Sequence, residues 1–216
     1  MASQALHLHT RLESQTIPIV LRTIQPQDAP GHSALLTADI QSSDPSASGI
    51  SVSRSEELIA AQTESAAVPT ILGKDGKVVS GPGRVNMVLV LKTEGEKIIG
   101  LGGFGAIKDW EREGRKIRAG DAGVVIDEKY RGKGYAVEAM KLAIDWAFTP
   151  VADGGPQLDI VTVTTTATNK AMLALTDDKL GLKGKGVLRD HEFGDPAGEM
   201  YYELTAEEWK ALKEKL

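Results

Sequence analysis

The chain contains no cysteine among its 216 residues. Disulfides, thiolate metal sites and a cysteine nucleophile are therefore excluded together, and the composition fits a reducing intracellular setting. The sequence also has no apolar run of the roughly 18 residues that a membrane span needs. The first ten residues lack the basic segment and long apolar stretch of a secretory signal. We therefore expect a cytoplasmic protein with no membrane partner.

Positive charge is scarce as well. Lysine and arginine total 25 against 30 aspartates and glutamates, which gives a net charge of -5. A nucleic-acid-binding surface needs a basic patch, so we expect no nucleic-acid partner. The four histidines have no spacing typical of a metal site. The P-loop, the dinucleotide fingerprint and the Gly-x-Ser-x-Gly nucleophile elbow are absent too.

Hydrophobic residues make up 41% of the chain and charged residues 25%, which predicts a packed core. Strands are expected at 16–22, 85–91, 97–107, 121–127, 158–164 and 199–204. Helices are expected at 32–36, at 135–148, at 169–180 with Thr168 as its cap, and after Thr205. A further helix is expected to begin after Ser53, which would be its cap. This order predicts an α/β (α+β) fold with a mixed sheet.

The connections between these elements are also predicted. Residues 41–49 are small and polar, and we expect a surface loop there. Residues 73–83 are predicted as a loop or loose hairpin, and 108–116 as a loop or an exposed strand extension. We expect a flexible N-terminus over 1–14 and a single domain over 15–216.

The clearest helix pattern follows a short loop that contains two glycines. Apolar residues recur at three- and four-residue spacing from Ala136 to Ala147, and Pro150 ends the pattern. A strand, a tight glycine loop and a helix in direct succession leave unpaired amides at the helix start, where the helix dipole adds positive potential. The sequence therefore predicts a phosphate or pyrophosphate site, to which Arg131 and Lys133 add charge-assisted contacts.

This loop reads Arg131, Gly132, Lys133, Gly134, Tyr135, Ala136. It matches the pattern Q/R-x-x-G-x-G/A of the pyrophosphate loop in the GNAT acetyltransferase superfamily, and residues 123–139 resemble that family's strand, loop and helix in continuous register. Downstream, Asn169 and residues 179–182 resemble the branch of ribosomal-protein N-terminal acetyltransferases (RimJ/RimL type). The resemblance is strong over 98–182 and faint over 36–83. It implies the GNAT fold, a mixed and mostly antiparallel sheet with a splayed strand pair, flanked by helices.

The resemblance also implies a reaction, the direct attack of an amine on the thioester of acetyl-CoA. In this family, strand backbone groups hold the pantetheine arm and polarise the thioester carbonyl, and by register these belong to Val124, Val125 and Ile126. By the same resemblance, the loop residues 131–136 would bind the pyrophosphate. Asn169 would hydrogen-bond the pantetheine or a nearby carbonyl, or it is a polar residue near a helix cap.

The general base is expected at Asp121. Residues 120–124 align with a pattern A-E-I-G-Y of the related branch, which places Asp121 at its glutamate; the alternative is a solvated turn residue. Glu111 and Glu113, in the charged segment before it, are further candidates.

The sequence departs from the family at the group that would protonate the leaving thiolate. A tyrosine is common there, but this chain has Asp177, and the branch's serine is replaced by Met172. An aspartate is ionised near neutral pH and is a poor proton donor. The substitutes open to the chain are water and its four tyrosines: Tyr130, Tyr135, Tyr201 and Tyr202.

Two functions follow from these patterns. The first is an N-acetyltransferase acting on a small amine or a protein N-terminus, with a homodimer expected because related proteins often form one. The second is a CoA-binding sensor or interaction module that has lost catalysis, motivated by the missing tyrosine.

Overall fold

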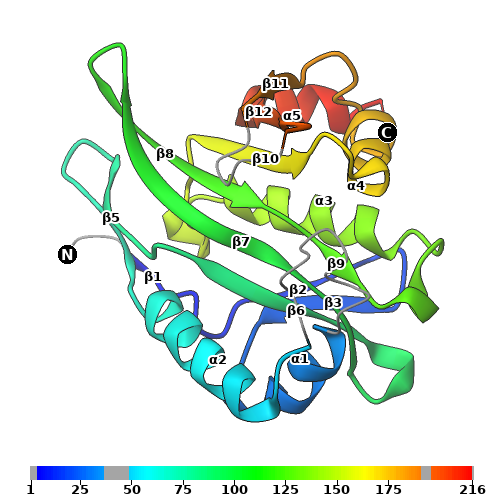
Figure 1. The fold of residues 1–216 in the computed structure, drawn as a ribbon. Coiled ribbons are helices and arrows are strands. Elements are labelled where there is room, and N and C mark those ends of the chain that lie inside the picture. The colour runs from blue at the N-terminus through cyan, green and yellow to red at the C-terminus, as the bar shows by residue number, and fades with distance from the viewer. Residues whose placement is uncertain (1–3, 37–48, 191–195, 216) are drawn as a thin grey trace.

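The computed structural model describes residues 4–36, 49–190 and 196–215. The predicted loop at 41–49 lies outside these ranges except for Gly49. A nine-stranded sheet forms the centre, in the order β11-β12-β10-β8-β7-β6-β3-β2, with β9 paired to β7 (Figure 1). Its strands are β2 (Arg11–Glu13), β3 (Ile19–Thr23), β6 (Val85–Leu91), β7 (Lys97–Arg112), β8 (Arg115–Ala122), β9 (Val125–Ile126), β10 (Ile160–Thr166), β11 (Val187–Arg189) and β12 (Glu199–Leu204). A second sheet joins β1 (Gln4–Ala5), β4 (Thr70–Leu72) and β5 (Val78–Ser80).

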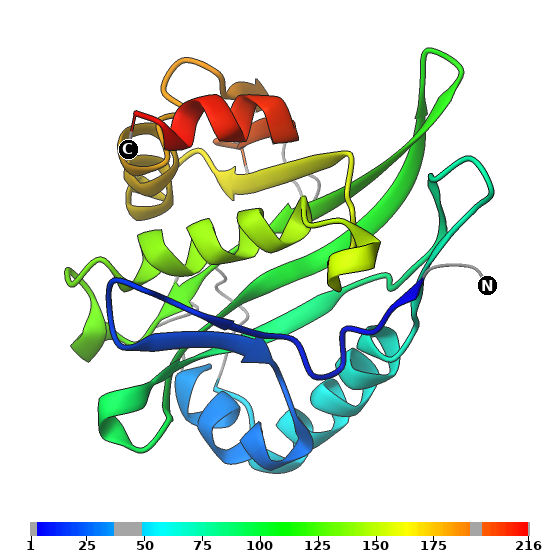
Figure 2. The same ribbon diagram turned by 180° about the vertical axis from the view of Figure 1, so that it is seen from behind.

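Helices lie on both faces of the large sheet (Figures 1 and 2). One face carries α1 (Ala29–Leu35) and α2 (Val52–Ala66), and the other carries α3 (Tyr135–Ala147), α4 (Lys170–Ala174) and α5 (Ala206–Lys213). A π-helical turn at Leu175–Lys179 extends α4, and short 3-10 turns lie at Pro26–Asp28, Lys92–Glu94, Glu128–Tyr130 and Val151–Asp153. This arrangement confirms the α/β (α+β) class.

The alternation of residues along β10 explains why its two faces differ. Val161 and Val163 are buried in the cluster that includes α3, whereas Thr162 and Thr164 point to the opposite face. On that opposite face α1 and α2 pack over β6 and β7. On this same face, no helix of the described ranges packs over the β8, β10 and β12 half. That half of the sheet presents polar side chains to a cavity.

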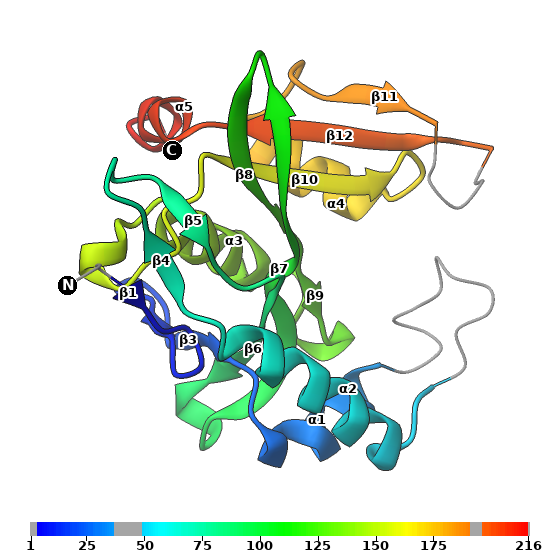
Figure 3. The ribbon, with the colours of Figure 1, turned by 90° about the vertical axis from the view of Figure 1, so that its left-hand side faces the viewer.

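Some predicted boundaries differ from the structure, and one open alternative is decided by it. The strand expected at 121–127 is two strands, β8 and β9, because the pairing with β7 shifts register between Phe104 and Ala106. The segment 108–116 is the strand extension rather than the loop, and the hairpin β7–β8 projects beyond the rest of the sheet (Figure 3). Helix α2 is capped by Ser51, whose side chain accepts from the amide of Arg54, and not by Ser53.

The N-terminal segment also differs from the expected flexible terminus. Residues 4–13 include β1 and β2, and the side chain of His7 is fully buried. Its Nε2 lies 2.7 Å from the hydroxyl of Thr70, and its ring packs edge-on against Trp146 at 5.2 Å. The apolar and hydrogen-bonding contacts of this histidine explain why the segment is held against the domain.

We predict that His7 makes folding sensitive to acid. Burial, and then the charge of Arg118, lower the pKa of His7 from 6.5 to about 4. Between these values the unfolded chain binds a proton that the folded chain does not, so stability falls as the pH drops from 6.5 towards 4, by about 3 kcal/mol in all. Denaturant unfolding across this range should show a shallower pH dependence for His7→Gln. The exposed neighbour variant His9→Gln is the control, and identical slopes for all three proteins would contradict the prediction.

Candidate functional site

The sheet opens between β8 and β10. These two strands pair in parallel only where Ala119, Gly120 and Asp121 meet the first three residues of β10. Beyond this point β8 ends at Ala122, and the chain continues through Gly123 and Val124 into β9, which pairs with β7 alone. This is the splayed strand pair that the sequence resemblance implied. It leaves one edge of the segment 123–126 without a neighbouring strand.

The backbone of Val124 faces this open edge. The amide of Gly123 donates to the carbonyl of Gly103, and the amide of Asp127 donates to the carbonyl of Ile99, so both point towards β7. Successive amides of an extended chain point to opposite sides. The amides of Val124 and Ile126 therefore point away from β7, whereas the amide of Val125 points towards it. Of the three predicted backbone contacts, Val124 and Ile126 have amides that point to the open edge, where a ligand can reach them, and Val125 does not.

The loop at 131–136 presents unpaired amides at the start of α3. Gly132 and Gly134 have φ values of 74° and 81°, which favour glycine. The first helical bond runs from the amide of Glu138 to the carbonyl of Gly134. In the described chain, the amides of Tyr135, Ala136 and Val137 have no backbone acceptor. Apart from its chain neighbours, a Cβ built on either glycine would meet no protein atom within 4 Å, so there is open space beside this loop.

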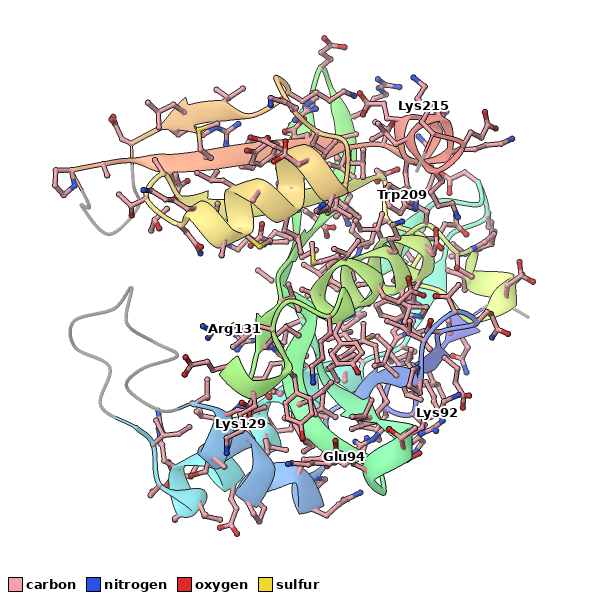
Figure 4. The ribbon with its side chains drawn as sticks, turned by 90° about the vertical axis from the view of Figure 1, so that its right-hand side faces the viewer. Lys92, Glu94, Lys129, Arg131, Trp209 and Lys215 are labelled. Atoms are coloured by element: carbon pink, nitrogen blue, oxygen red, sulfur yellow. The ribbon has the colours of Figure 1, made fainter. Side chains whose placement is uncertain are left out.

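Arg131 is held beside this loop. Its Nε donates to the carbonyl of Ile126 at 3.1 Å, which ties the end of β9 to the helix start. Figure 4 shows Arg131 at the N-terminal end of α3, between the layer of α1 and α2 and the layer of α4. Lys133 Nζ lies 5.3 Å from the ring centre of Tyr130. The structure thus brings Arg131 of the loop and the end of the segment 124–126 together.

The carboxylate of Asp121 lies on the open face of the sheet. The hydroxyls of Thr162 and Thr164 donate to the same oxygen, Oδ1, at 2.8 and 2.9 Å. Its other oxygen, Oδ2, has no hydrogen-bond donor in the described chain. Burial raises the pKa of Asp121, and the two threonine hydroxyls oppose that shift. Asp121 is therefore a half-buried carboxylate with one free oxygen rather than a solvated turn residue.

Asp121 faces a cavity of about 560 Å³. Its lining includes Asp121, Thr162, Thr164, Trp110, Arg189 and Tyr201. The hairpin β7–β8 is fastened beside it, because the guanidinium of Arg112 donates to both oxygens of Glu203 on β12, at 2.7 and 2.9 Å. Glu111 and Glu113 are exposed near the hairpin tip and do not line this cavity. Asp121 is thus the one predicted base that faces it.

Asn169 has a structural role that the sequence left as the alternative. Its Oδ1 accepts from the amide of Met172 at 3.1 Å and caps α4, the role that we had predicted for Thr168. Its Nδ2 has no acceptor within the described ranges. Capping therefore uses only one end of the amide, and the other end stays available to a ligand.

Three of the four tyrosine hydroxyls that could protonate the leaving thiolate already donate hydrogen bonds. The hydroxyl of Tyr202 donates to Asp177 at 2.9 Å, and burial raises the pKa of Tyr202 to about 12. The hydroxyls of Tyr201 and Tyr130 donate to Glu203 and Glu94. Tyr135 is the remaining tyrosine, and no hydrogen bond of its hydroxyl is found in the part of the chain that the structure describes.

Sequence reasoning missed most of the cavity lining. Thr162, Thr164 and Arg189 belong to no sequence motif, and only their positions on neighbouring strands bring them together.

A second cavity of about 220 Å³ lies between α1, α2 and the sheet, lined by His32, Gln62 and Asn86. The side-chain oxygens of Gln62 and Asn86 are buried there without a partner.

Two further observations concern metal ions and membranes. The described residues contain no group of three or more histidines and carboxylates that could hold a metal ion. None of the helices in the same ranges combines the length and hydrophobicity that a membrane crossing requires.

Known proteins match this geometry. The family model of the acetyltransferase (GNAT) domain matches residues 19–183. A ribosomal-protein-S5-alanine acetyltransferase from Vibrio fischeri is similar at 18% identity and a TM-score of 0.60, covering 93% of this chain and 98% of that one. RimL, an alpha-N-protein acetyltransferase solved in complex with coenzyme A, has 12% identity and a TM-score of 0.62 over 91% and 98%. FdhC, a nucleotide-linked sugar GNAT, has 15% identity and a TM-score of 0.63 over 96% of both chains. A comparison with curated proteins finds no match.

The family model covers most of the chain, and the open strand edge and glycine loop lie within its range. The chain belongs to the GNAT family and is an N-acetyltransferase that uses acetyl-CoA.

Proposed function

We propose that this chain transfers the acetyl group of acetyl-CoA to a small amine bound in the cavity beside Asp121. The observation that carries the proposal is the outward-facing amide of Val124, which lies three residues from Asp121 and at the open edge between β8 and β10. A donor for a carbonyl oxygen and a base for an amine thereby lie on one short segment.

The residues that bind coenzyme A in this proposal are the predicted ones. The free amides at the start of α3, with Arg131 and Lys133, suit the pyrophosphate. The backbone of Val124 and Ile126 suits the pantetheine arm, and the Nδ2 of Asn169 adds a donor at the start of α4. When bound, acetyl-CoA supplies a thioester whose carbonyl carbon accepts the amine.

The chain contributes position and polarity to the reaction. The Val124 amide is aimed to donate to the thioester oxygen, where negative charge grows as the amine attacks. Oδ2 of Asp121, directly or through water, takes the proton that the amine loses. Holding the two reactants in this geometry supplies a large part of the acceleration. Protonation of the thiolate falls to water or to a tyrosine, because Asp177 already accepts a hydrogen bond from Tyr202.

The acceptor is proposed to be a small amine rather than a protein N-terminus. The support is the cavity, which measures about 560 Å³ and is bordered on one side by the fastened hairpin β7–β8. We also propose a cytoplasmic location and a homodimer, as the sequence led us to expect.

The proposal predicts both binding and turnover. Titration calorimetry should detect association of acetyl-CoA and of CoA with the protein, and a thiol-release assay should detect acetyl transfer to at least one member of a panel of small amines. Tight binding of both compounds without transfer to any amine would instead favour the second function, a CoA-binding sensor. The absence of any binding would reject both.

A further inference from the structure

The cavity beside Asp121 holds a guanidinium as well as a carboxylate. Arg189 lies on β11 and reaches over the ring of Tyr201, with its Cζ 3.3 Å from the ring centre. Both residues line the cavity. Stacking on an aromatic face fixes the plane of a guanidinium and leaves the N–H groups at its edge free to donate.

No ion pair of the described residues includes this exposed guanidinium, although its charge, after that of Arg112, helps to lower the pKa of the nearby Glu203. Glu199 is the direct cross-strand neighbour of Arg189 in the β11–β12 pair and also lines the cavity. Even so, no ion pair joins the two, and no carboxylate of the described residues lies within ion-pair distance of Arg189. Arginine is always charged and matches a carboxylate with two parallel hydrogen bonds. An exposed guanidinium that is oriented at the lining of a cavity and forms no ion pair is suited to an anionic group of a ligand.

Resting on the proposed function, we infer that the acceptor amine also carries a carboxylate, which Arg189 binds while Asp121 faces the amine. Asp121 and Arg189 carry opposite charges and line the same cavity, so they suit the two ends of a ligand that has both an amine and a carboxylate. Asp121 keeps Oδ2 for a donor, and Arg189, stacked on Tyr201 and without an ion pair, has N–H groups to offer an acceptor.

The strand spacing sets the distance between the two sites. Tyr201, under the guanidinium, is on β12, and Asp121 is on β8, with β10 between them. Neighbouring strands lie about 4.8 Å apart, so the two charged groups are separated by roughly 10 Å. A hydrogen bond of about 3 Å at each end leaves roughly 4 Å between the amine and the carboxylate. This span is longer than an α-amino acid allows and favours two or three intervening carbons.

A series of acceptors tests the inference. Glycine, β-alanine, γ-aminobutyrate and δ-aminovalerate are compared with alkylamines in which a methyl group replaces the carboxylate. For β-alanine and γ-aminobutyrate we expect a kcat/KM about tenfold above that of the matched alkylamine, because a charge-assisted hydrogen-bond pair is lost with the carboxylate. Glycine should show no such advantage. The difference should lie mainly in KM.

Variants of Arg189 assign the effect. In Arg189→Gln the ratio of acid to alkylamine should fall to about one, and Arg189→Lys should keep part of it, since a lysine retains the charge without the planar fork. Arg115→Gln is the matched control, because Arg115 is exposed at the far end of the hairpin β7–β8 and does not line the cavity. Its ratio should equal that of the unaltered protein.

The outcomes separate this inference from the proposed function. Transfer to amines with no preference for the acids would overturn the inference and leave the function standing. A preference that survives in Arg189→Gln would overturn the role of Arg189. Transfer to no amine of either series, with acetyl-CoA bound, would reject the proposed function, and the inference with it.

Discussion

Replacing Asp121 with asparagine is expected to lower kcat for acetyl transfer by about a hundredfold or more. General-base catalysis by a positioned side chain typically contributes 10² to 10⁴ in rate. Asparagine keeps an oxygen that accepts from Thr162 and Thr164, so the local hydrogen bonds can persist. The amide cannot take a proton from the acceptor. Calorimetric binding of acetyl-CoA should stay within about twofold of the unaltered protein, since the chemistry rather than the cofactor site is changed.

The pH profile gives a second readout of the same residue. Burial raises the pKa of Asp121 above its ordinary value. As the pH falls through this raised pKa, the carboxyl becomes protonated and can no longer act as a base. The unaltered enzyme should therefore lose kcat/KM on the acid side with a slope of one proton, and Asp121→Asn should lack this limb. An acid limb that is the same in both proteins would assign the base to another group.

Stability separates the loss of a base from a loss of fold. Because the folded pKa of Asp121 is raised above the unfolded one, its contribution to stability is greatest at low pH and is lost as the pH rises through the folded pKa. At neutral pH the ionised carboxylate is thus a cost to folding, as functional groups often are. Asp121→Asn should melt at a temperature no lower than the unaltered protein. Full activity in a stable variant would remove Asp121 from the mechanism.

The local geometry of the proposed cofactor side could be predicted from the sequence, because it depends on neighbouring residues. A helix start such as 131–136 is specified by neighbouring residues, since glycine, positive φ and unpaired amides all follow from one short segment. The strand before it was placed correctly in the fold, but its division at Gly123 was not predicted. That break arises from a register shift on β7, in a segment some twenty residues upstream.

The acceptor side could not be read from the sequence, because it is assembled from long-range pairing. Thr162 and Thr164 looked like ordinary residues of a β-branched strand, and only the parallel pairing of β8 with β10 brings them to Asp121. Arg189 lies on a three-residue strand that no pattern predicted, and its place over Tyr201 depends on the β11–β12 register. Asn169 shows the opposite limit, because its polar side chain fitted both a cap and a ligand, and the structure uses one oxygen for the cap.

Gly134→Ala is expected to weaken CoA binding on the order of thirtyfold, or about 2 kcal/mol. Gly134 has a φ of 81°, and a Cβ there would meet no protein atom within 4 Å. Alanine therefore strains the backbone and adds a methyl group to the open space beside the loop, where the pyrophosphate is proposed to bind. Titration calorimetry with CoA measures the loss.

Gly114 provides a control for the backbone strain alone. It has a φ of 71° at the tip of the β7–β8 hairpin, and a Cβ there also meets nothing within 4 Å. Gly114→Ala and Gly134→Ala should each destabilise the fold by about 1 kcal/mol. Only Gly134→Ala should lose affinity for CoA. Equal affinities in the two variants would mean that the diphosphate does not approach the start of α3, and the acetyl-CoA site would have to lie elsewhere on the sheet.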